Sequence, residues 1–218
     1  MRSPICSLIS LGQLLKDKHN KVDVKQREKM INAINSSSRV TYNLLENLLQ
    51  WAKSESGLIT INPKQLNIKD LFNNNVDLFQ QFIVSKNITI NDHINKDIFV
   101  FADFETIDTV VRNLLSNAIK FTPDNGKIDF NYTLEPENEI RFCVSDTGKG
   151  IKHEDLEKIF NPVLQFTTSG TKNEKGTGLG LNLCKEFIKK NGGDIHVESE
   201  PGKGSKFYFT LKIKNKLN

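Results

Sequence analysis

The most constraining feature of this sequence is an uninterrupted stretch from Val22 to Ser56 that lacks both proline and glycine. Within it, apolar and small residues recur at spacings of three and four, which predicts one long helix with a single buried face. The repeating positions are Met30, Ile31, Ile34, Thr41, Leu44, Leu45, Leu48 and Ala52. Because a helix of this kind is stable in water only when its apolar face is covered, the segment must have a partner.

A shorter segment, Ile5 to Leu15, has a similar apolar repeat, and polar residues at 16–23 separate it from the long helix. The two segments predict an antiparallel helical hairpin. One hairpin cannot cover both faces, so we expect a second copy to complete a four-helix bundle, a homodimer through residues 1–56. The arms measure about 50 Å and about 23 Å. We therefore expect that part of the shorter arm is missing, or that the far end of the long helix packs elsewhere.

Gly57 and Pro63 mark a change of pattern. We expect a linker at 57–63, a second domain at 64–214 and a tail at 215–218. Apolar periodicity in the second domain predicts helices at 68–85, 103–121 and 179–191 and strands at 88–90, 98–101, 128–134, 140–144, 194–199 and 205–213. The prediction is an α+β protein: the helical hairpin, then an α/β sandwich with a mixed, largely antiparallel sheet and helices on one face.

Composition argues against several functions. Hydrophobic residues make up 37% and charged residues 26%, as in ordinary soluble proteins, and no apolar run is long enough to span a bilayer. The net charge of +4 is modest and comes from residues 1–56 without interleaved aromatic residues, so we expect no nucleic-acid partner. Cys6, Cys143 and Cys184 lack metal-ligand spacing and are interpreted as reduced thiols of a cytosolic protein.

Three motifs of the second domain carry candidate chemistry, and the first is RNLLSNAIKFT at 112–122. On a helix, Asn113, Asn117, Lys120 and Phe121 share one face. An amide oxygen can ligate Mg²⁺ without adding charge, and an ammonium group attracts a phosphate, so this face suits a magnesium polyphosphate. The alternative is an ordinary amphipathic helix whose amides cap neighbouring groups.

The second motif, VSDTGKGI at 144–151, places Asp146 at the end of a strand, before Gly148 and Gly150. Glycines permit a sharp turn and a close approach to a ligand, and a buried carboxylate can accept a hydrogen bond from the exocyclic amine of adenine. An acidic glycine-rich turn without a ligand is the alternative.

The third motif, KGTGLGLNLCKEF at 175–187, carries glycines at 176, 178 and 180 that lead into a helix. Backbone N–H groups at the beginning of such a helix can hold phosphates. The pattern is neither a Walker loop nor a dinucleotide fingerprint, because Leu181 stands where the third glycine of the fingerprint would be. A flexible glycine-rich linker is the alternative.

Together, in this order, the three motifs resemble the histidine-kinase branch of the ATPase superfamily that includes gyrase, Hsp90 and MutL. The match continues to GSKFYF at 204–209, and the hairpin, which ends in NLLQWAKSESG, looks like the dimerisation and histidine phosphotransfer domain of the same kinases. The resemblance implies that Asn117 ligates Mg²⁺ and that Asp146 binds the adenine amine, with Ser205 joined through a water. The other nucleotide-contacting residues that it implies are Asn113, Lys120, Phe121, Gly148, Gly150, Ile151, Thr171, Gly176, Thr177, Gly178, Leu179, Gly180 and Leu181.

The resemblance also implies a mobile lid over ATP at residues 152–175, here named the lid segment. Phe160 and Pro162 match the phenylalanine box of the family, whereas Val163 stands where a second phenylalanine is common. This departure leaves open how the lid segment packs on the hairpin.

The first helix of this family bears its phosphoacceptor in the pattern H[ED]LR[ST]P, and Arg2-Ser3-Pro4 matches the end of that pattern. We therefore expect the acceptor histidine to lie upstream of residue 1. Ser3 falls where the family positions water for dephosphorylation of the regulator, and helix capping is its alternative role. The histidines of the chain, which lack the flanking pattern, are His19, His93, His153 and His196.

The predicted function is the cytoplasmic catalytic core of a two-component sensor histidine kinase. In the full-length parent it would phosphorylate a histidine from ATP and pass the phosphate to a receiver-domain aspartate of a response regulator. We expect this chain to bind ATP with Mg²⁺ without autophosphorylating. If the parent is an inner-membrane sensor, we expect its membrane attachment to reside in other parts of that protein. The alternatives are a natural, non-catalytic nucleotide-binding dimerisation module and an ATP-driven conformational machine.

Overall fold

The computed structural model describes residues 2–17, 23–55, 60–94, 96–161, 163–164, 166–172, 174 and 176–213. The chain divides into two compact units, Met1–Ser56 and Gly57–Asn218, and each is described by itself. Within the described residues, no helix combines the length and the apolar character that a membrane span requires.

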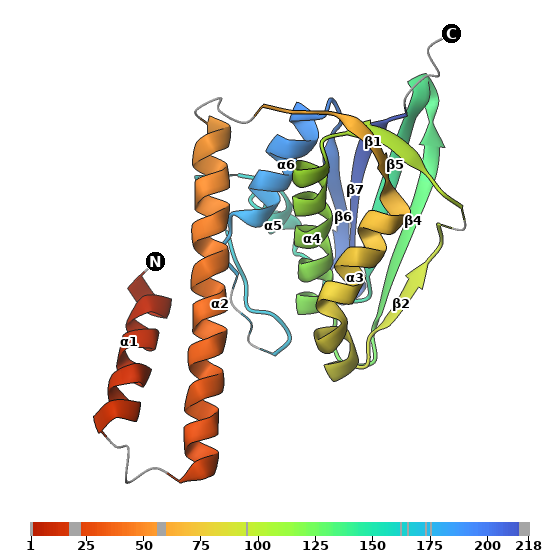
Figure 1. The fold of residues 1–218 in the computed structure, drawn as a ribbon. Coiled ribbons are helices and arrows are strands. Elements are labelled where there is room, and N and C mark those ends of the chain that lie inside the picture. The colour runs from red at the N-terminus through yellow and green to blue at the C-terminus, as the bar shows by residue number, and fades with distance from the viewer. Residues whose placement is uncertain are drawn as a thin grey trace. The chain divides into compact units, whose positions relative to one another are not determined.

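The first unit is a pair of antiparallel helices, α1 (Arg2–Asp17) and α2 (Val24–Glu55), which pack against one another (Figure 1). Asp23 begins α2, because its carboxylate accepts a hydrogen bond from the backbone N–H of Gln26 at 2.7 Å. The predicted connector lies largely outside the described residues. Apolar side chains of both helices remain exposed within this unit: Ile5, Ile9, Leu14, Ile31, Leu45 and Leu49. The hairpin alone therefore leaves part of its apolar surface in water.

The second unit is built on a five-stranded sheet in the order β2-β4-β5-β7-β6. Its first strand, β2 (Thr89–Asp92), runs parallel to β4 (Lys127–Glu135). The remaining neighbours are antiparallel: β5 (Glu139–Asp146), β7 (Gly204–Lys212) and β6 (Ile195–Glu200). The predicted α+β class and the mixed, largely antiparallel sheet are confirmed.

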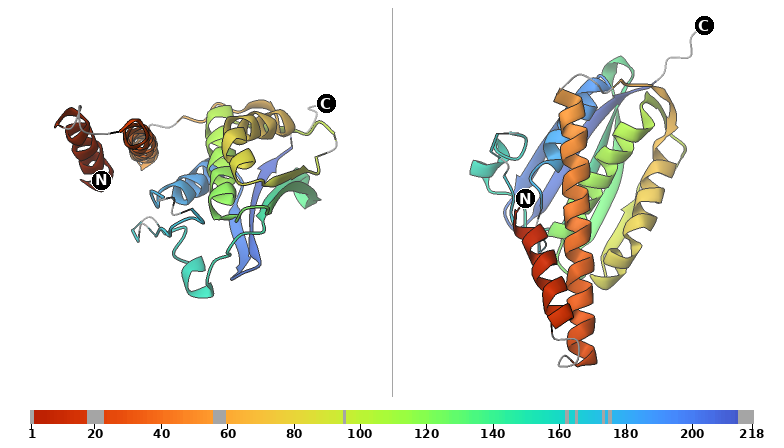
Figure 2. Two further views of the ribbon diagram at one scale, coloured as in Figure 1. Left: turned by 90° about the horizontal axis from the view of Figure 1, so that it is seen from below. Right: turned by 60° about the vertical axis from the view of Figure 1, so that its left-hand side comes forward.

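Three helices cover one face of this sheet, as Figure 2 shows: α3 (Ile68–Ser85), α4 (Phe104–Phe121) and α6 (Gly180–Lys190). Side chains of flanking residues begin two of them. Asn67 accepts from the N–H of Lys69 at 3.1 Å, and Asp103 accepts from the N–H of Thr106 at 3.0 Å. These three helices begin at, or one residue after, their predicted positions.

A row of buried aromatic rings joins the helices to the sheet. Phe72 of α3 stacks on Phe130 of β4 with ring centroids 3.9 Å apart, and Phe142 and Phe209 continue the row across β5 and β7. All four side chains are fully buried. Because this row fixes α3 against the central strands, the elements that carry the three motifs stand on a packed core.

The structure adds elements that were not predicted. A two-stranded antiparallel sheet joins β1 (Lys64–Asn67) to β3 (Phe99–Ala102), and the prediction missed β1. The turn after β4 is a short 3₁₀ helix, Pro136–Asn138, and the lid segment contains a single helical turn, α5 (His153–Leu156).

Candidate functional site

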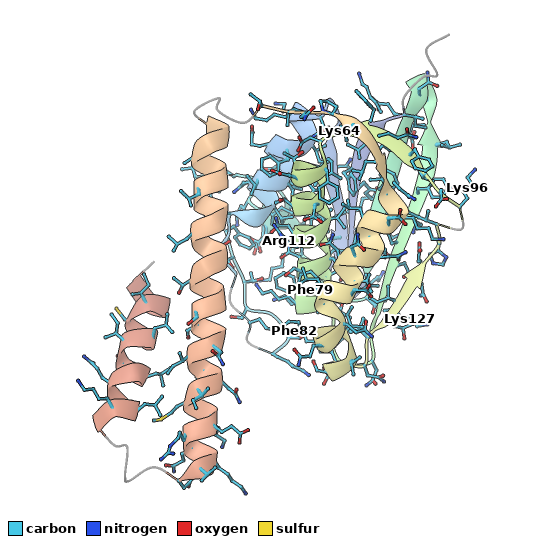
Figure 3. The ribbon with its side chains drawn as sticks, in the orientation of Figure 1. Lys64, Phe79, Phe82, Lys96, Arg112 and Lys127 are labelled. Atoms are coloured by element: carbon cyan, nitrogen blue, oxygen red, sulfur yellow. The ribbon has the colours of Figure 1, made fainter. Side chains whose placement is uncertain are left out.

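The C-terminal half of α4 carries the first motif, and its polar side chains are half-buried on one helix face. In Figure 3, the label of Arg112 marks the residue before Asn113 on this helix. The Asn113 amide donates to the backbone carbonyl of Thr109 at 2.9 Å, which leaves its side-chain oxygen as an acceptor. The side chain of Asn117 has no hydrogen-bond partner among the described residues. Asn117 thus offers a neutral amide oxygen to a ligand.

Lys120, in the last turn of α4, has a lowered pKa. Burial lowers the pKa of its ammonium group to about 8, with repulsion from Lys149 acting in the same direction and attraction to Glu174 opposing it. Its Nζ lies 4.5 Å from the centroid of the Phe121 ring and donates to the carbonyl of Thr168 at 3.0 Å. A lysine with this pKa changes charge close to neutral pH.

Asp146, the last residue of β5, is a buried carboxylate that no cation pairs with among the described residues. Its exposed fraction is 8%, and burial raises its pKa to about 6, although hydrogen bonds from the backbone N–H groups of Gly148 and Ser205 oppose the rise. The Gly148 bond is 2.8 Å long. Sheet register places Ser205 of β7 directly opposite Asp146. The strands therefore hold this carboxylate in one place.

Two glycines of the second motif allow this close packing. A Cβ atom on Gly148 would lie 2.5 Å from Oδ1 of Asp146 and 2.6 Å from the carbonyl oxygen of Phe121. Gly150 has a φ of +68°, and a Cβ there would collide with the carbonyl of Glu200. Between them, the N–H of Lys149 donates to the carbonyl of Phe121 at 3.2 Å, so the second motif is joined directly to the first.

The third motif also meets α4. The helix α6 begins at Gly180 without a side-chain cap, so its first N–H groups have no side-chain acceptor. A Cβ on Gly180 would lie 2.6 Å from the side-chain oxygen of Asn113, and one on Gly176 would lie 2.9 Å from Nζ of Lys120. The structure thus brings all three motifs together around the C-terminal half of α4.

The residues present fit a magnesium nucleotide. A buried carboxylate, a free amide oxygen, an ammonium group and an uncapped helix N-terminus are complementary to an adenine amine, a divalent cation and phosphates. No cluster of three His, Cys, Asp or Glu side chains that could hold a metal occurs in the described part of the chain.

Other predicted residues are engaged within the protein. The Thr171 hydroxyl accepts from Lys86 at 2.8 Å and lies 3.1 Å from the carbonyl of Thr122. The Ser205 hydroxyl is bonded to that of Ser199 at 2.9 Å. The side chains of Ile151, Leu179 and Leu181 are buried or partly buried against the core, and Thr177 accepts from the N–H of Leu179 at 3.3 Å. Ile151, Leu179 and Leu181 can therefore offer only their backbone groups for hydrogen bonds to a ligand.

Some expectations reach residues outside the described set. The side chain of Ser3, within α1, is not described, and Pro162 of the phenylalanine box also lies outside it. Phe160 packs partly against the core, whereas Val163 is 86% exposed. The departure from the family pattern thus falls at a solvent-exposed position.

The sequence prediction missed two lysines. Nζ of Lys149 lies 4.9 Å from the centroid of the Phe121 ring and donates to the carbonyl of Ser169 at 2.6 Å. Its position inside the DTGKG motif was a usable signal. Lys86 is buried beneath the end of α4, and nothing in its sequence context indicates that.

Comparison with known proteins identifies the fold and its family. The family model described as "Histidine kinase-, DNA gyrase B-, and HSP90-like ATPase" matches residues 102–215, the part of the chain that contains all three motifs. The chain belongs to this ATPase family. Its second unit contains an ATPase domain of this family, and curated relatives that match the chain are sensor histidine kinases.

Two curated relatives of the ATPase family match nearly the whole chain. The adaptive-response sensory kinase SasA of Synechocystis is 32% identical over 98% of this chain and 56% of its own length. The sensor histidine kinase RcsC of Salmonella typhimurium is 34% identical over 98% of this chain and 22% of its own length. The chain therefore spans about half, or less, of these relatives.

Solved structures of the ATPase family share the fold. The histidine kinase ThkA in complex with the response regulator TrrA aligns with a TM-score of 0.76 and 27% identity, covering 98% of this chain and 58% of that one. The histidine kinase AdeS of Acinetobacter baumannii, at 21% identity, has a TM-score of 0.74 and covers 98% of this chain and 97% of its own.

Proposed function

We propose that this chain is the catalytic core of a two-component sensor histidine kinase and that it binds ATP with Mg²⁺ between α4, the end of β5 and the beginning of α6. The observation that carries the proposal is the convergence of the three motifs on α4, next to a buried carboxylate that has no cationic partner among the described residues. In the kinase, the γ-phosphate would pass to a histidine and then to an aspartate of a receiver domain.

At the adenine end, Asp146 would accept a hydrogen bond from the exocyclic amine. The hydrogen bonds from Gly148 and Ser205 fix the orientation of the carboxylate before the nucleotide arrives. Guanine presents a carbonyl oxygen at the same place, which would be repelled by a buried carboxylate. Asp146 would therefore select adenine nucleotides, because a buried polar group that lacks its partner is costly.

At the phosphate end, Asn117 would hold Mg²⁺, which supplies neutralisation of phosphate charge when it is bound. Lys120 would hold a phosphate oxygen, after exchanging its present acceptor, the carbonyl of Thr168, for that oxygen. The uncapped N–H groups at Gly180 would donate to the same phosphates. The three groups together would orient the γ-phosphate for in-line transfer.

For the first unit, we propose dimerisation through residues 1–56. The exposed apolar side chains of α1 and α2 support this, since a second hairpin would cover them. A receiver domain is the proposed partner in phosphotransfer, in agreement with the complex of ThkA with a response regulator. We therefore propose a cytoplasmic location, where both ATP and such regulators occur.

We further propose that these 218 residues bind nucleotide without phosphorylating themselves, because α1 contains no histidine. The same observation favours the second candidate, a non-catalytic nucleotide-binding module that dimerises with a complete kinase. Incubation with γ-labelled ATP tests the first statement: we expect no acid-labile, base-stable phosphoprotein, and its appearance would contradict the proposal. Mixing the chain with a histidine-bearing kinase and looking for mixed dimers tests the second.

Binding itself is tested by calorimetric titration with ATP and Mg²⁺. We expect a single saturable site per chain in the wild type. An absence of binding at millimolar ATP would overturn the proposed function.

A further inference from the structure

Lys86, the residue that follows α3, is buried to an extent that is rare for lysine. Its side chain is 4% exposed, and Nζ points at the last turn of α4. There it donates to the backbone carbonyls of Ile119 at 2.9 Å, Lys120 at 3.2 Å and Thr122 at 3.5 Å. These carbonyls belong to the end of a helix, where the chain leaves acceptors without helical partners and the dipole favours a cation.

The same ammonium group reaches the lid segment. Nζ of Lys86 donates to the hydroxyl of Thr171 at 2.8 Å and forms an ion pair with Glu174 at 2.8 Å. Burial alone would raise the pKa of Glu174, but hydrogen bonds from Lys86, from its own backbone N–H and from the N–H of Lys172 hold that pKa below its ordinary value. Lys86 therefore joins two segments that are far apart in the sequence.

The lid residues that Lys86 contacts belong to a group joined by hydrogen bonds, here named the anchor turn (residues 170–172 and 174). The N–H of Gly170 donates to the carbonyl of Glu174 at 2.9 Å, and the N–H of Lys172 donates to its carboxylate at 2.7 Å. The N–H of Thr171 donates to the carbonyl of Lys120 at 3.0 Å. The turn therefore sits on the last residues of α4.

This arrangement bears directly on Lys120 of the nucleotide site. A Cβ on Gly170 would lie 2.6 Å from Cγ of Lys120, so the anchor turn contacts the stem of this side chain. Nζ of Lys120 donates to Thr168, two residues before the turn. If the anchor turn leaves the end of α4, Lys120 loses the contact that fixes the stem of its side chain.

We propose that Lys86 is a positioning residue for nucleotide binding: it seats the anchor turn on the C-terminal end of α4 and thereby fixes Lys120 at the phosphate end of the site. The seating needs no nucleotide, whereas the effect on phosphate binding rests on the proposed function. An ammonium group removed from water requires its full set of acceptors, so the turn and Lys86 hold each other in place.

A second tie to the turn provides a matched control. Nζ of Lys172 forms an ion pair with Asp124 at 2.9 Å, but these side chains are 45% and 54% exposed. Exposed pairs of this kind contribute little, because solvent screens them. Lys172→Ala removes this pair and a 3.4 Å hydrogen bond to the carbonyl of Ser85, but it removes no contact of the Lys86 ammonium group.

The first test is hydrogen exchange of the full chain without nucleotide. In Lys86→Met, we expect the amides of residues 170–172, whose N–H groups are hydrogen-bonded in the anchor turn, to exchange about 10-fold faster or more, since a charge-assisted hydrogen bond is lost. Amides of the first half of α4 should keep their rates. Glu174→Gln keeps the carbonyl contacts of Lys86 and should show a smaller increase in the same amides. Lys172→Ala should leave them within about 2-fold of wild type. Unchanged exchange in both Lys86→Met and Glu174→Gln would overturn the seating.

The second test compares ligands by calorimetric titration. Lys86→Met should weaken the binding of ATP with Mg²⁺ by about 10-fold and leave adenosine binding within about 2-fold, since only the phosphate end is disturbed. The double variant Lys86→Met with Glu174→Gln should be no weaker than Lys86→Met alone, because both act through one contact. Equal losses for ATP and adenosine would mean a general structural role and overturn the link to Lys120. Failure of the wild type to bind ATP would instead overturn the proposed function and leave the exchange result standing.

Discussion

The two ends of the candidate site are built in different ways. At the adenine end, Asp146 terminates a strand that is paired on both sides, and its carboxylate is held by the backbone of Gly148 and Ser205. At the phosphate end, Lys120 and Lys149 donate to the carbonyls of Thr168 and Ser169 in the lid segment. The adenine end thus rests on the sheet, whereas the phosphate end rests on a loop.

The difference teaches how such a site would take up a nucleotide. The adenine end needs no rearrangement, because its carboxylate is already oriented and buried. At the phosphate end, lid carbonyls occupy the lysines that phosphate would need, so binding there exchanges one set of acceptors for another. Substitutions at the two ends should therefore differ in which ligands they affect.

The largest effect is expected for Asp146→Asn. Loss of a buried carboxylate acceptor, and its replacement by an amide that can present a donor, should weaken binding by roughly 100-fold. Because the proposed contact of Asp146 is with the base, ATP, ADP and adenosine should be affected equally. Titration of all three ligands measures this. Asp129→Asn, at a partly buried carboxylate of β4 that bonds Asn91 and His93, is the control that keeps wild-type affinity. A loss confined to ATP would contradict the assignment of Asp146 to the adenine end.

The next effect is expected for Asn117→Ala. Removal of the amide oxygen should weaken ATP binding with Mg²⁺ by about 10-fold, because a ligand of the metal is lost. Adenosine, which has no phosphates, should bind as it does to the wild type. The magnesium dependence of ATP affinity is the measurement, and equal losses for adenosine and ATP would contradict the assignment of Asn117 to the phosphate end.

Nucleotide affinity should fall at both low and high pH, with an acid limb caused by Asp146 and a basic limb caused by Lys120. Asp146 has a pKa raised to about 6, so it gains a proton as the pH falls through that value and its acceptor strength is lost. Lys120 has a pKa lowered to about 8, so its positive charge is lost as the pH rises through that value. Nucleotide affinity should thus be greatest between these values and fall several-fold per pH unit outside them.

One variant and one change of ligand show which residue causes each limb. Lys120→Arg keeps its charge at all pH values and should remove the basic limb for ATP. Adenosine should show only the acid limb in the wild-type protein. A basic limb that persists in Lys120→Arg would show that titration of Lys120 does not cause the loss of affinity at high pH.

The smallest effect is expected for Lys149→Ala. This lysine is exposed and lies beside the ring of Phe121, so its removal should weaken ATP binding by about 2-fold to 3-fold and adenosine binding less. The effect should diminish at high salt, because the charge is screened. A loss as large as that of Asn117→Ala would show that Lys149 is a principal phosphate ligand.

The sequence allowed much of this fold and site to be predicted, for identifiable physical reasons. Strong apolar periodicity located the helices of the second unit, and helix α3 has the predicted bounds of 68–85. The motifs are local, so Asp146 at a strand end and Gly180 at a helix beginning could be placed from their neighbours alone.

The remainder depends on contacts between distant segments. Strand β1 has one buried apolar side chain, Leu66, and forms because β3 lies beside it, so its pattern carries little signal. From the sequence, Lys86 is expected to be an exposed lysine. It is buried only because the end of α4 and the lid segment, which are distant in the sequence, surround it. The hydroxyl of Thr171 is likewise occupied by those groups, which no local pattern indicates.

The central claim is that Asp146 recognises adenine in a preformed site. Titration of the wild-type chain with ATP and with GTP, both with Mg²⁺, tests it most directly, because the two nucleotides share their phosphates and differ in the group that meets the carboxylate. We predict that ATP binds at least about 100-fold more tightly, since guanine would place an acceptor against a buried acceptor. Comparable affinity for GTP would contradict the claim.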